Sequence, residues 1–244
     1  MTSLFARVKS AGLDRFGYRV HVETLSEPAV GFVLVTLVGS ELAENTWHAG
    51  DRVSLRMPED ELRSYTPFDW DQRAGRARLL GVGLADGPGT RYLRALKVGD
   101  QVQVLGPKRS VNLDLERAPI IVGDETVLGL CAAWNNAHPD LSATVLLEAA
   151  DIAACRAAAH AIGVAPDRIV NDRASLVADT IEAAQANAAA PLVLSGRAQT
   201  IAAVRRELKA AALNDRHTSR STSRSTSRST AARAYWDENR AGLD

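Results

Sequence analysis

The first half of the chain is built from short stretches in which hydrophobic and polar residues alternate, separated by turns that contain glycine or proline. This pattern, together with many β-branched residues, is typical of β-strands. It predicts strands at residues 18–22, 31–38, 52–57, 76–82 and 101–105. Residues 90–96 are the exception, because Tyr92, Leu93 and Leu96 fall at helical spacing. Several short strands at this spacing favour a small antiparallel β-barrel.

The pattern changes near Ala118. From there, short runs that are apolar throughout alternate with alanine-rich stretches of helical period. Strands are predicted at residues 119–123, 143–148, 168–170 and 191–196, and helices at residues 126–136, 152–161, 175–188 and 200–213. Such alternation is typical of a parallel sheet covered on both faces. The sequence therefore predicts a two-domain chain, with an antiparallel β-barrel over residues 1–117 and an α/β domain over residues 118–244.

Composition and charge narrow the functional classes. The chain has 244 residues, 46% of them hydrophobic, and its 29 Lys and Arg residues balance 29 Asp and Glu residues. A buried core is therefore expected, and strong nucleic-acid binding is not, because the chain has no net positive charge. No run approaches the roughly 18 apolar residues of a membrane span, and the start of the chain has no apolar run long enough for a signal peptide. We expect a cytoplasmic protein that does not enter the membrane.

The two cysteines, Cys131 and Cys155, are too few for a disulfide framework and form no Cys-x-x-Cys pair. This favours a reducing compartment and argues against a thiolate metal site. The five histidines are scattered singly, without the spacing of metal ligands, so we expect no bound metal ion. Cys131 and Trp134 fall on an apolar helical stretch and are expected in the core.

Residues 218–230 read TSRSTSRSTSRST, a four-residue repeat with no apolar side chain. Such a segment buries too little surface to offset the entropy of ordering, so we expect a flexible loop. An alternative is a non-enzymatic binding protein in which Arg220, Arg224 and Arg228 engage nucleic acid or an acidic partner. After the repeat, the aromatic pair at residues 235–236 is a candidate for returning the tail to the body of the protein.

A first candidate site is the segment Arg63-Ser64-Tyr65-Thr66, which follows the third predicted strand. A guanidinium suits a pyrophosphate, since it pairs with two oxygens at once. An aromatic ring stacks on a flat heterocycle, and a hydroxyl bonds a ring nitrogen. The alternative is an ordinary strand end at the surface, because three fixed residue types alone make a weak motif.

A second candidate is Gly87-Pro88-Gly89-Thr90, which leads into the helix predicted at residues 90–96. Glycines allow a ligand to approach the backbone closely, and Thr90 is suited to cap the helix. The N–H groups of the first helical turn attract phosphate. The alternative is a capped helix with a plain turn before it.

Taken together, these segments resemble the siderophore-interacting proteins, which are FAD-dependent ferric-siderophore reductases within the ferredoxin–NADP reductase-like superfamily. The markers occur in the order Arg63-Ser64-Tyr65-Thr66, Gly87-Pro88-Gly89-Thr90, Gly99-Asp100-Gln101-Val102, Gly106-Pro107, Gly123-Asp124-Glu125-Thr126 and Tyr235-Trp236. The likeness runs from about Gly17 to Thr126 and continues more thinly to Trp236. It implies a flavin-binding barrel followed by a nicotinamide-nucleotide-binding α/β domain.

The resemblance assigns roles to the barrel residues. Arg63, with Ser64 beside it, would contact the FAD phosphates. Tyr65 would pack against the flavin and Thr66 would lie near its reactive edge, so these two residues would serve catalysis. The segment from Gly87 through Pro88 and Gly89 to Thr90 would hold the pyrophosphate.

The same resemblance places Asp124, Glu125 and Thr126, which follow the first apolar strand, where NADPH or NADH enters. Ligands bind at the carboxyl ends of parallel strands, which agrees with this placement. Arg197 stands at the end of another such strand, where the family usually carries glutamate. We expect it to contact the nucleotide, with the 2′-phosphate of NADP as its candidate partner.

Other positions also depart from the family. Gly83 stands where a histidine is common, and Lys108-Arg109 where Arg-Gly is typical; residues 237–238, Asp-Glu, follow Trp236 in place of basic or aromatic residues. Lys108, Arg109 and Trp236 are candidate substrate contacts, because two cations would attract an anionic siderophore. A solvated turn is the alternative for the two cations.

The reaction that the resemblance implies is reduction of Fe(III) in a siderophore by NADPH or NADH through bound FAD, with release of the iron inside the cell. A nicotinamide gives two electrons as hydride whereas iron takes one at a time, and a flavin does both. Hard oxygen ligands hold Fe(II) less firmly than Fe(III). An alternative keeps flavin and nucleotide but passes the electrons to a ferredoxin, a quinone or free flavin.

Overall fold

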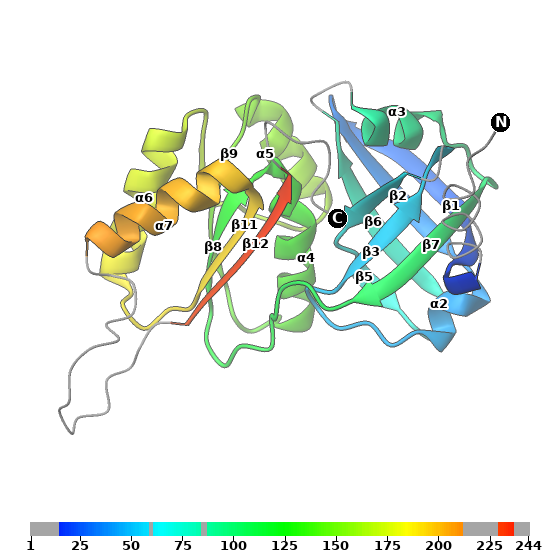
Figure 1. Cartoon of the computed structure of the whole chain (residues 1–244), viewed down its shortest axis with the longest axis horizontal. Coiled ribbons are helices and arrows are strands. Elements are labelled where there is room, and N and C mark those ends of the chain that lie inside the picture. Colours follow the sequence, from blue (N-terminus) through cyan, green and yellow to red (C-terminus); the bar gives the residue numbers. More distant parts are fainter. Residues whose placement is uncertain (1–14, 59–60, 84–86, 212–228, 237–244) are drawn as a thin grey trace, which may run out of the picture. The chain divides into compact units, whose positions relative to one another are not determined.

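The structure, a computed structural model, describes residues 15–58, 61–83, 87–211 and 229–236 (Figure 1). The chain forms two compact units, of which the first ends at Ser110 and the second begins at Val111. Each unit has its own buried apolar cluster. The two units are described separately below.

The first unit is an antiparallel sheet in which the strands follow the order β4-β3-β7-β1-β2-β6-β5. Its strands are β1 (Tyr18–Ala29), β2 (Phe32–Val38), β3 (Arg52–Arg56), β4 (Leu62–Tyr65), β5 (Phe68–Asp71), β6 (Arg76–Val82) and β7 (Gln101–Lys108), and its helices are α2 (Ser40–Glu44) and α3 (Pro88–Ala95). The edge strands β4 and β5 are joined only by Thr66 and Pro67, so the two edges of the sheet lie close together. The sheet therefore closes on itself, and the predicted antiparallel barrel is confirmed.

The strands β4 and β5, and the short helix α2, were not among the predicted elements. Both strands have only four residues, LRSY and FDWD; the first does not alternate apolar and polar positions, and the second alternates over too few residues to stand out from the sequence. Their backbone bonds to β3 and β6 hold them in place instead. These strands matter because β4 carries three of the four residues of the first candidate site.

The second unit is a parallel sheet with the strand order β10-β9-β8-β11-β12. Its strands are β8 (Ile120–Asp124), β9 (Thr144–Glu148), β10 (Arg168–Val170), β11 (Leu192–Arg197) and β12 (Thr230–Trp236). Its helices are η2 (Glu125–Val127), α4 (Leu128–Ala137), α5 (Ile152–Ala161), α6 (Arg173–Ala186) and α7 (Ala198–Ala210). Helices α6 and α7 lie on one face of the sheet and α4 and α5 on the other (Figure 1). The predicted α/β architecture is confirmed.

The last strand, β12, corrects the predicted extent of the flexible loop. Residues 218–228 of the repeat, including Arg220, Arg224 and Arg228, lie outside the described residues. The Ser229 carbonyl, however, accepts a hydrogen bond of 2.9 Å from Leu192 N, and Thr230 begins a strand that pairs with β11. The polar end of the repeat joins the sheet because ladder hydrogen bonds use only the backbone.

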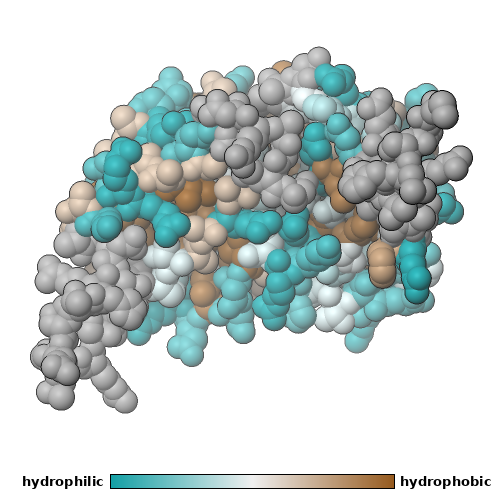
Figure 2. Space-filling model, in the orientation of Figure 1, coloured by the Kyte–Doolittle hydropathy of each residue, from teal (hydrophilic) through white to brown (hydrophobic). Residues whose placement is uncertain are grey.

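The surface is mainly hydrophilic and the large apolar side chains are mainly buried, as the composition predicts. On the face shown in Figure 2, hydrophilic side chains cover most of the described surface and hydrophobic ones form small, separate patches. Trp134 is fully buried, and its indole N–H donates to the Leu141 carbonyl at 3.1 Å. None of the helices within the described ranges is long and apolar enough to span a membrane.

The two cysteines are expected to be chemically inert in the folded protein. Cys131 in α4 and Cys155 in α5 are both buried, and burial raises the pKa of each thiol to about 12. Because the thiolate is the reactive form, neither should react with a disulfide reagent such as DTNB at pH 8. Both should react after unfolding in guanidinium chloride. Rapid release of one equivalent of thionitrobenzoate from the native protein would contradict this.

Candidate functional site

The first candidate site brings β4 and the start of α3 together. Side chains alternate along a strand, so Arg63 and Tyr65 lie on one side of β4. A Cβ built on Gly89 in α3 would lie 3.3 Å from Tyr65 Oη and 3.4 Å from Arg63 Cγ. Ser64 lies on the other side, where its Oγ is 3.1 Å from Ser54 Oγ and accepts a hydrogen bond from Arg52. The Arg63 side chain thus lies beside the start of α3 and the Ser64 hydroxyl does not, while the roles of both residues toward the FAD phosphates stay predictions.

The N-terminus of α3 offers an uncapped turn beside these side chains. Gly87 is the N-cap residue, Pro88 is the first helical residue, and no side chain among the described residues caps the helix. A Cβ on Gly87 would meet no atom within 4 Å, so the backbone there borders open space. The first N–H groups of a helix have no intrahelical partner and carry partial positive charge. The turn is thus suited to an anionic group such as a phosphate.

Thr90 does not cap this helix, which corrects the sequence-based expectation. It is the third residue of α3 and is buried, with Gly83 against its side chain. A Cβ at position 83 would lie 2.3 Å from Thr90 Cγ2. Gly83, where histidine is common in the resembled family, is thus matched to Thr90 in this chain.

Replacing Gly83 with alanine is expected to destabilise the first unit by about 1–3 kcal/mol, the usual cost of overpacking. The new methyl group would meet Thr90 Cγ2, so adding Thr90→Ser, which removes that methyl, should recover most of the loss. Urea unfolding of the single and double variants measures both effects. Equal losses in the two variants would show that the close contact is not the cause.

Arg63 is held at this site by an acidic neighbour that sequence reasoning missed. Its Nη2 lies 3.0 Å from Glu61 Oε2, and its Nη1 donates to the Leu62 carbonyl at 2.8 Å. The side chain of Glu61 is 43% exposed, so this ion pair is weak and exchangeable. An acidic residue two positions before the arginine was the available signal. Thr66, directly after β4, is buried.

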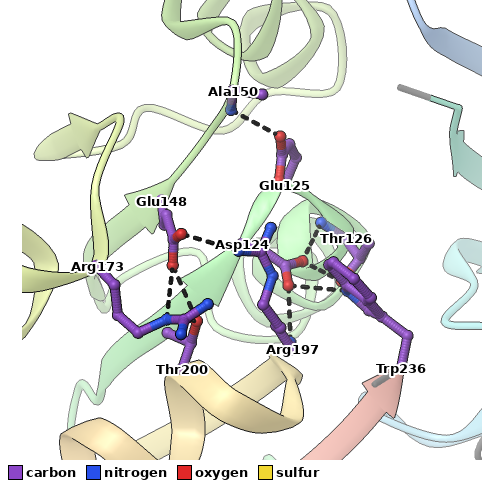
Figure 3. A network of polar contacts seen from close by, with 9 residues as sticks. All are labelled: Asp124, Glu125, Thr126, Glu148, Ala150, Arg173, Arg197, Thr200 and Trp236. Atoms are coloured by element: carbon purple, nitrogen blue, oxygen red, sulfur yellow. Dashed lines mark hydrogen bonds and ion pairs between the residues drawn. The ribbon is translucent and has the colours of Figure 1, made fainter. Parts of the chain in front are cut away.

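The second candidate site lies at the carboxyl ends of the parallel strands and centres on Asp124 (Figure 3). Asp124 Oδ1 accepts hydrogen bonds from the backbone N–H of Thr126, at 2.9 Å, and from its hydroxyl. Oδ2 accepts from Arg197 N at 2.7 Å and from Trp236 Nε1 at 2.9 Å. Burial raises the pKa of the Asp124 carboxyl, and these four hydrogen bonds oppose the rise. Gly196, with φ of 99°, is required here because a Cβ would lie 2.7 Å from Oδ2.

A second carboxylate, that of Glu148 at the end of β9, forms ion pairs with Arg173 and Arg197. Its Oε1 accepts from Arg197 Nη1 at 3.0 Å, and its Oε2 accepts from Thr200 Oγ1 at 2.9 Å. Arg173 Nε lies 3.8 Å from Oε2 and donates to Thr200 Oγ1 at 3.0 Å. Two guanidinium groups thus share the carboxylate of Glu148 at this edge of the sheet. A guanidinium group is suited to bind an anionic ligand such as a phosphate.

The sequence analysis identified only part of this network. Asp124, Thr126, Arg197 and Trp236 were all candidates, and the structure brings them together. Glu148, Arg173 and Thr200 were missed, although Glu148 ends a predicted strand and the strand-end rule pointed to it. Trp236 belongs to this network in the second unit, whereas Lys108 and Arg109 are exposed at the end of β7 in the first. The roles of all these residues toward a ligand stay predictions.

The buried side chain of Glu125 is expected to make the free energy of unfolding depend on pH. It is buried, its Oε1 accepts a hydrogen bond of 3.0 Å from Ala150 N, and burial raises its pKa. Above the unfolded value of about 4.3, the folded chain binds more protons than the unfolded one, so stability falls as pH rises through the folded pKa. Glu125→Gln keeps the acceptor and removes the charge, so its urea midpoint should change less between pH 5 and pH 8. Glu182→Gln, at an exposed position of α6, should retain the wild-type profile.

Comparison with known proteins agrees with the fold described for the two units. Residues 37–112 match the oxidoreductase FAD-binding domain family. A siderophore utilization protein from T. fusca superposes with a TM-score of 0.67 at 22% identity, covering 93% of this chain and 95% of that one. The siderophore-interacting protein from Aeromonas hydrophila gives a TM-score of 0.63 at 16% identity, covering 92% and 93%. This chain has the fold of the siderophore-interacting proteins.

Other relatives widen the comparison. Phthalate dioxygenase reductase superposes with a TM-score of 0.65 at 15% identity, covering 93% of this chain and 70% of that one. NADH-cytochrome b5 reductase 1 from Aspergillus oryzae is 43% identical over 64 residues, which are 24% of this chain and 22% of that protein. The two-domain fold is thus shared with phthalate dioxygenase reductase as well, and the chain matches about a fifth of the length of its curated relatives.

Proposed function

We propose that the protein is a cytoplasmic flavin-dependent oxidoreductase that carries electrons from NADH or NADPH to a ferric siderophore. The observation that carries the proposal is the contact of Arg63 and Tyr65 with Gly89 at the uncapped start of α3, within the stretch that matches the FAD-binding family. Superposition with two siderophore-interacting proteins over almost the whole chain supports the choice of substrate.

The residues of the first unit fit FAD. In the proposal, the Arg63 guanidinium and the first N–H groups of α3 bind the pyrophosphate, since both are positive and the Arg63 side chain lies beside Gly89 in the first turn of α3. Tyr65 packs against the flat ring system, and Thr66 lies near it as a hydrogen-bonding group. Bound FAD supplies a carrier that accepts two electrons as hydride and releases them singly.

The residues of the second unit fit a pyridine nucleotide. In the proposal, the nucleotide binds at the carboxyl ends of β8 and β11, where Asp124, Thr126 and Arg197 form one bonded group. Arg197 and Arg173 attract its phosphates, and Glu148 limits how far the two side chains move. No residue is required as a general base, because hydride transfer removes no proton from the substrate.

The proposed acceptor is a ferric siderophore, toward which the exposed Lys108 and Arg109 present positive charge. Each NAD(P)H supplies two electrons and therefore reduces two Fe(III) ions, whose oxygen ligands then bind the resulting Fe(II) less firmly. A second candidate function delivers the electrons to another acceptor, such as a haem protein, a ferredoxin, a quinone or free flavin. The 43% identity with an NADH-cytochrome b5 reductase over 64 residues favours keeping this candidate in the test.

The experiment is an absorption spectrum of the purified, FAD-loaded protein, followed by anaerobic titration with NADH and with NADPH. We expect a flavin band that bleaches with one of the two nucleotides. Steady-state rates with a ferric hydroxamate, a ferric catecholate, cytochrome b5, a ferredoxin, a quinone and free flavin then rank the acceptors. A protein that stays colourless, or a flavin that neither nucleotide reduces, would refute the proposal. A faster rate with cytochrome b5 than with the ferric siderophores would change only the proposed electron acceptor.

A further inference from the structure

One buried carboxylate joins three neighbouring strands of the second unit. Asp124 ends β8, and its Oδ2 accepts both the backbone N–H of Arg197, at the end of β11, and the indole N–H of Trp236, at the end of β12. The strands lie in the order β8-β11-β12, so the Trp236 side chain reaches across β11. Figure 3 shows this convergence of three strand ends on one side chain.

The register of β12 places Trp236, and not its neighbour, at this point. The pairing between β11 and β12 is regular from the pair Leu192 and Thr230 to the pair Gly196 and Ala234. It then shifts by one residue, so that Arg197 pairs with Trp236. Tyr235 is passed over by this irregularity. The positive φ of Gly196 lies at the same place, where the backbone approaches Asp124. The sheet is thus distorted at the one position that brings the indole to Arg197 and Asp124.

Trp236 also restrains the Arg197 side chain. The Arg197 guanidinium carbon lies 4.5 Å from the centre of the Trp236 ring, while Nη1 is bonded to Glu148. An arginine side chain loses roughly 2 kcal/mol of rotamer entropy when it is fixed. A group already held between a ring and a carboxylate has lost part of that entropy before a ligand arrives, which strengthens binding.

We propose that Trp236 is a positioning residue of the nucleotide site, which makes affinity for NAD(P)H depend on the docking of β12 against β11. The inference rests on the proposed function, because it takes Arg197 as a contact of the nucleotide. Trp236 acts through Arg197 and Asp124, and the strand that carries it is the edge strand of the sheet. Any change that releases β12 therefore weakens nucleotide binding and leaves FAD binding in the first unit unchanged.

The test compares Trp236→Phe, which keeps the ring and loses the N–H donor, with Trp236→Leu, which loses both. Calorimetric titration of the FAD-loaded protein should show the dissociation constant for NADH or NADPH rising about threefold in the Phe variant and about tenfold or more in the Leu variant. Tyr235→Phe, the neighbour on the same strand, should stay within about twofold of wild type. The FAD dissociation constant should be unchanged in all three.

A cycle with Arg197→Gln separates a positioning role from a merely structural one. If Trp236 acts through Arg197, adding Trp236→Leu to Arg197→Gln should raise the nucleotide dissociation constant little further. Additive effects, or wild-type affinity in Trp236→Leu, would overturn the inference while the reductase function stands. Absence of nucleotide binding in the wild-type protein would instead refute the proposed function and this inference with it. Thermal unfolding of each variant checks that it is folded.

Discussion

Replacing Arg63 with alanine is expected to weaken FAD binding by about 10- to 150-fold. A hydrogen bond between a guanidinium and a phosphate is charge-assisted and contributes roughly 1.5–3 kcal/mol, which corresponds to that range. The loss should be specific, since the Arg63 side chain lies beside Gly89 at the start of α3, a helix that no side chain caps within the part of the chain that the structure describes. Fluorescence titration of the apoprotein with FAD measures the dissociation constant. The FAD affinity of Arg63→Lys should lie between those of the wild type and Arg63→Ala, because lysine keeps the charge but not the planar set of hydrogen-bond donors.

Two further variants make this prediction sharper. Glu61→Gln removes the carboxylate 3.0 Å from Arg63 Nη2, so FAD affinity should stay equal or rise by up to about fivefold, the strength of an exposed ion pair. Arg94→Ala, in the last turn of the same helix and exposed, should leave FAD affinity unchanged. Wild-type affinity in Arg63→Ala would show that the phosphate binds elsewhere, and the flavin site would have to be moved.

Replacing Asp124 with alanine is expected to cost the second unit about 3–5 kcal/mol of unfolding free energy. The substitution leaves four donors, from Thr126, Arg197 and Trp236, without their acceptor in a fully buried position. An unsatisfied buried donor costs roughly 1–3 kcal/mol, although the Thr126 hydroxyl is able to rotate. Denaturant-dependent hydrogen exchange, resolved by mass spectrometry, assigns the loss to the second unit.

The matched control is Asp172→Ala. Asp172 is also a carboxylate of the second unit, but it is exposed and caps α6, where its Oδ1 accepts a hydrogen bond of 2.8 Å from Ser175 N. Loss of such a cap costs about 1 kcal/mol. Asp124→Asn keeps one acceptor oxygen, so its loss of unfolding free energy should lie between those of Asp124→Ala and Asp172→Ala. Equal losses in Asp124→Ala and Asp172→Ala would mean that water replaces the buried carboxylate and that Asp124 does not join the strands.

The sequence alone determined the architecture and the position of most candidate groups. Apolar runs such as residues 120–122 and 192–194 are buried on both faces, and such runs favour a parallel sheet wherever they occur. Alternating stretches in the first half specified the barrel in the same way. Arg63, Tyr65 and Gly89 were recognisable because each residue type has its own chemistry toward a phosphate or a ring, independent of its neighbours.

Tertiary structure decided which of these groups meet. The strand β12 has no run of β-branched or alternating residues that would predict it, since residues 231–234 read Ala-Ala-Arg-Ala, and it is held by its backbone ladder with β11. Glu148 could not be linked to Thr200, 52 residues away, because that contact depends on how α7 packs on the sheet. Propensity and periodicity act over a few neighbouring residues, whereas hydrogen bonds between distant segments arise only after the strands have paired. For that reason single candidates such as Asp124 and Arg197 were predictable, whereas Glu148, Arg173 and Thr200 and the network that they complete were not.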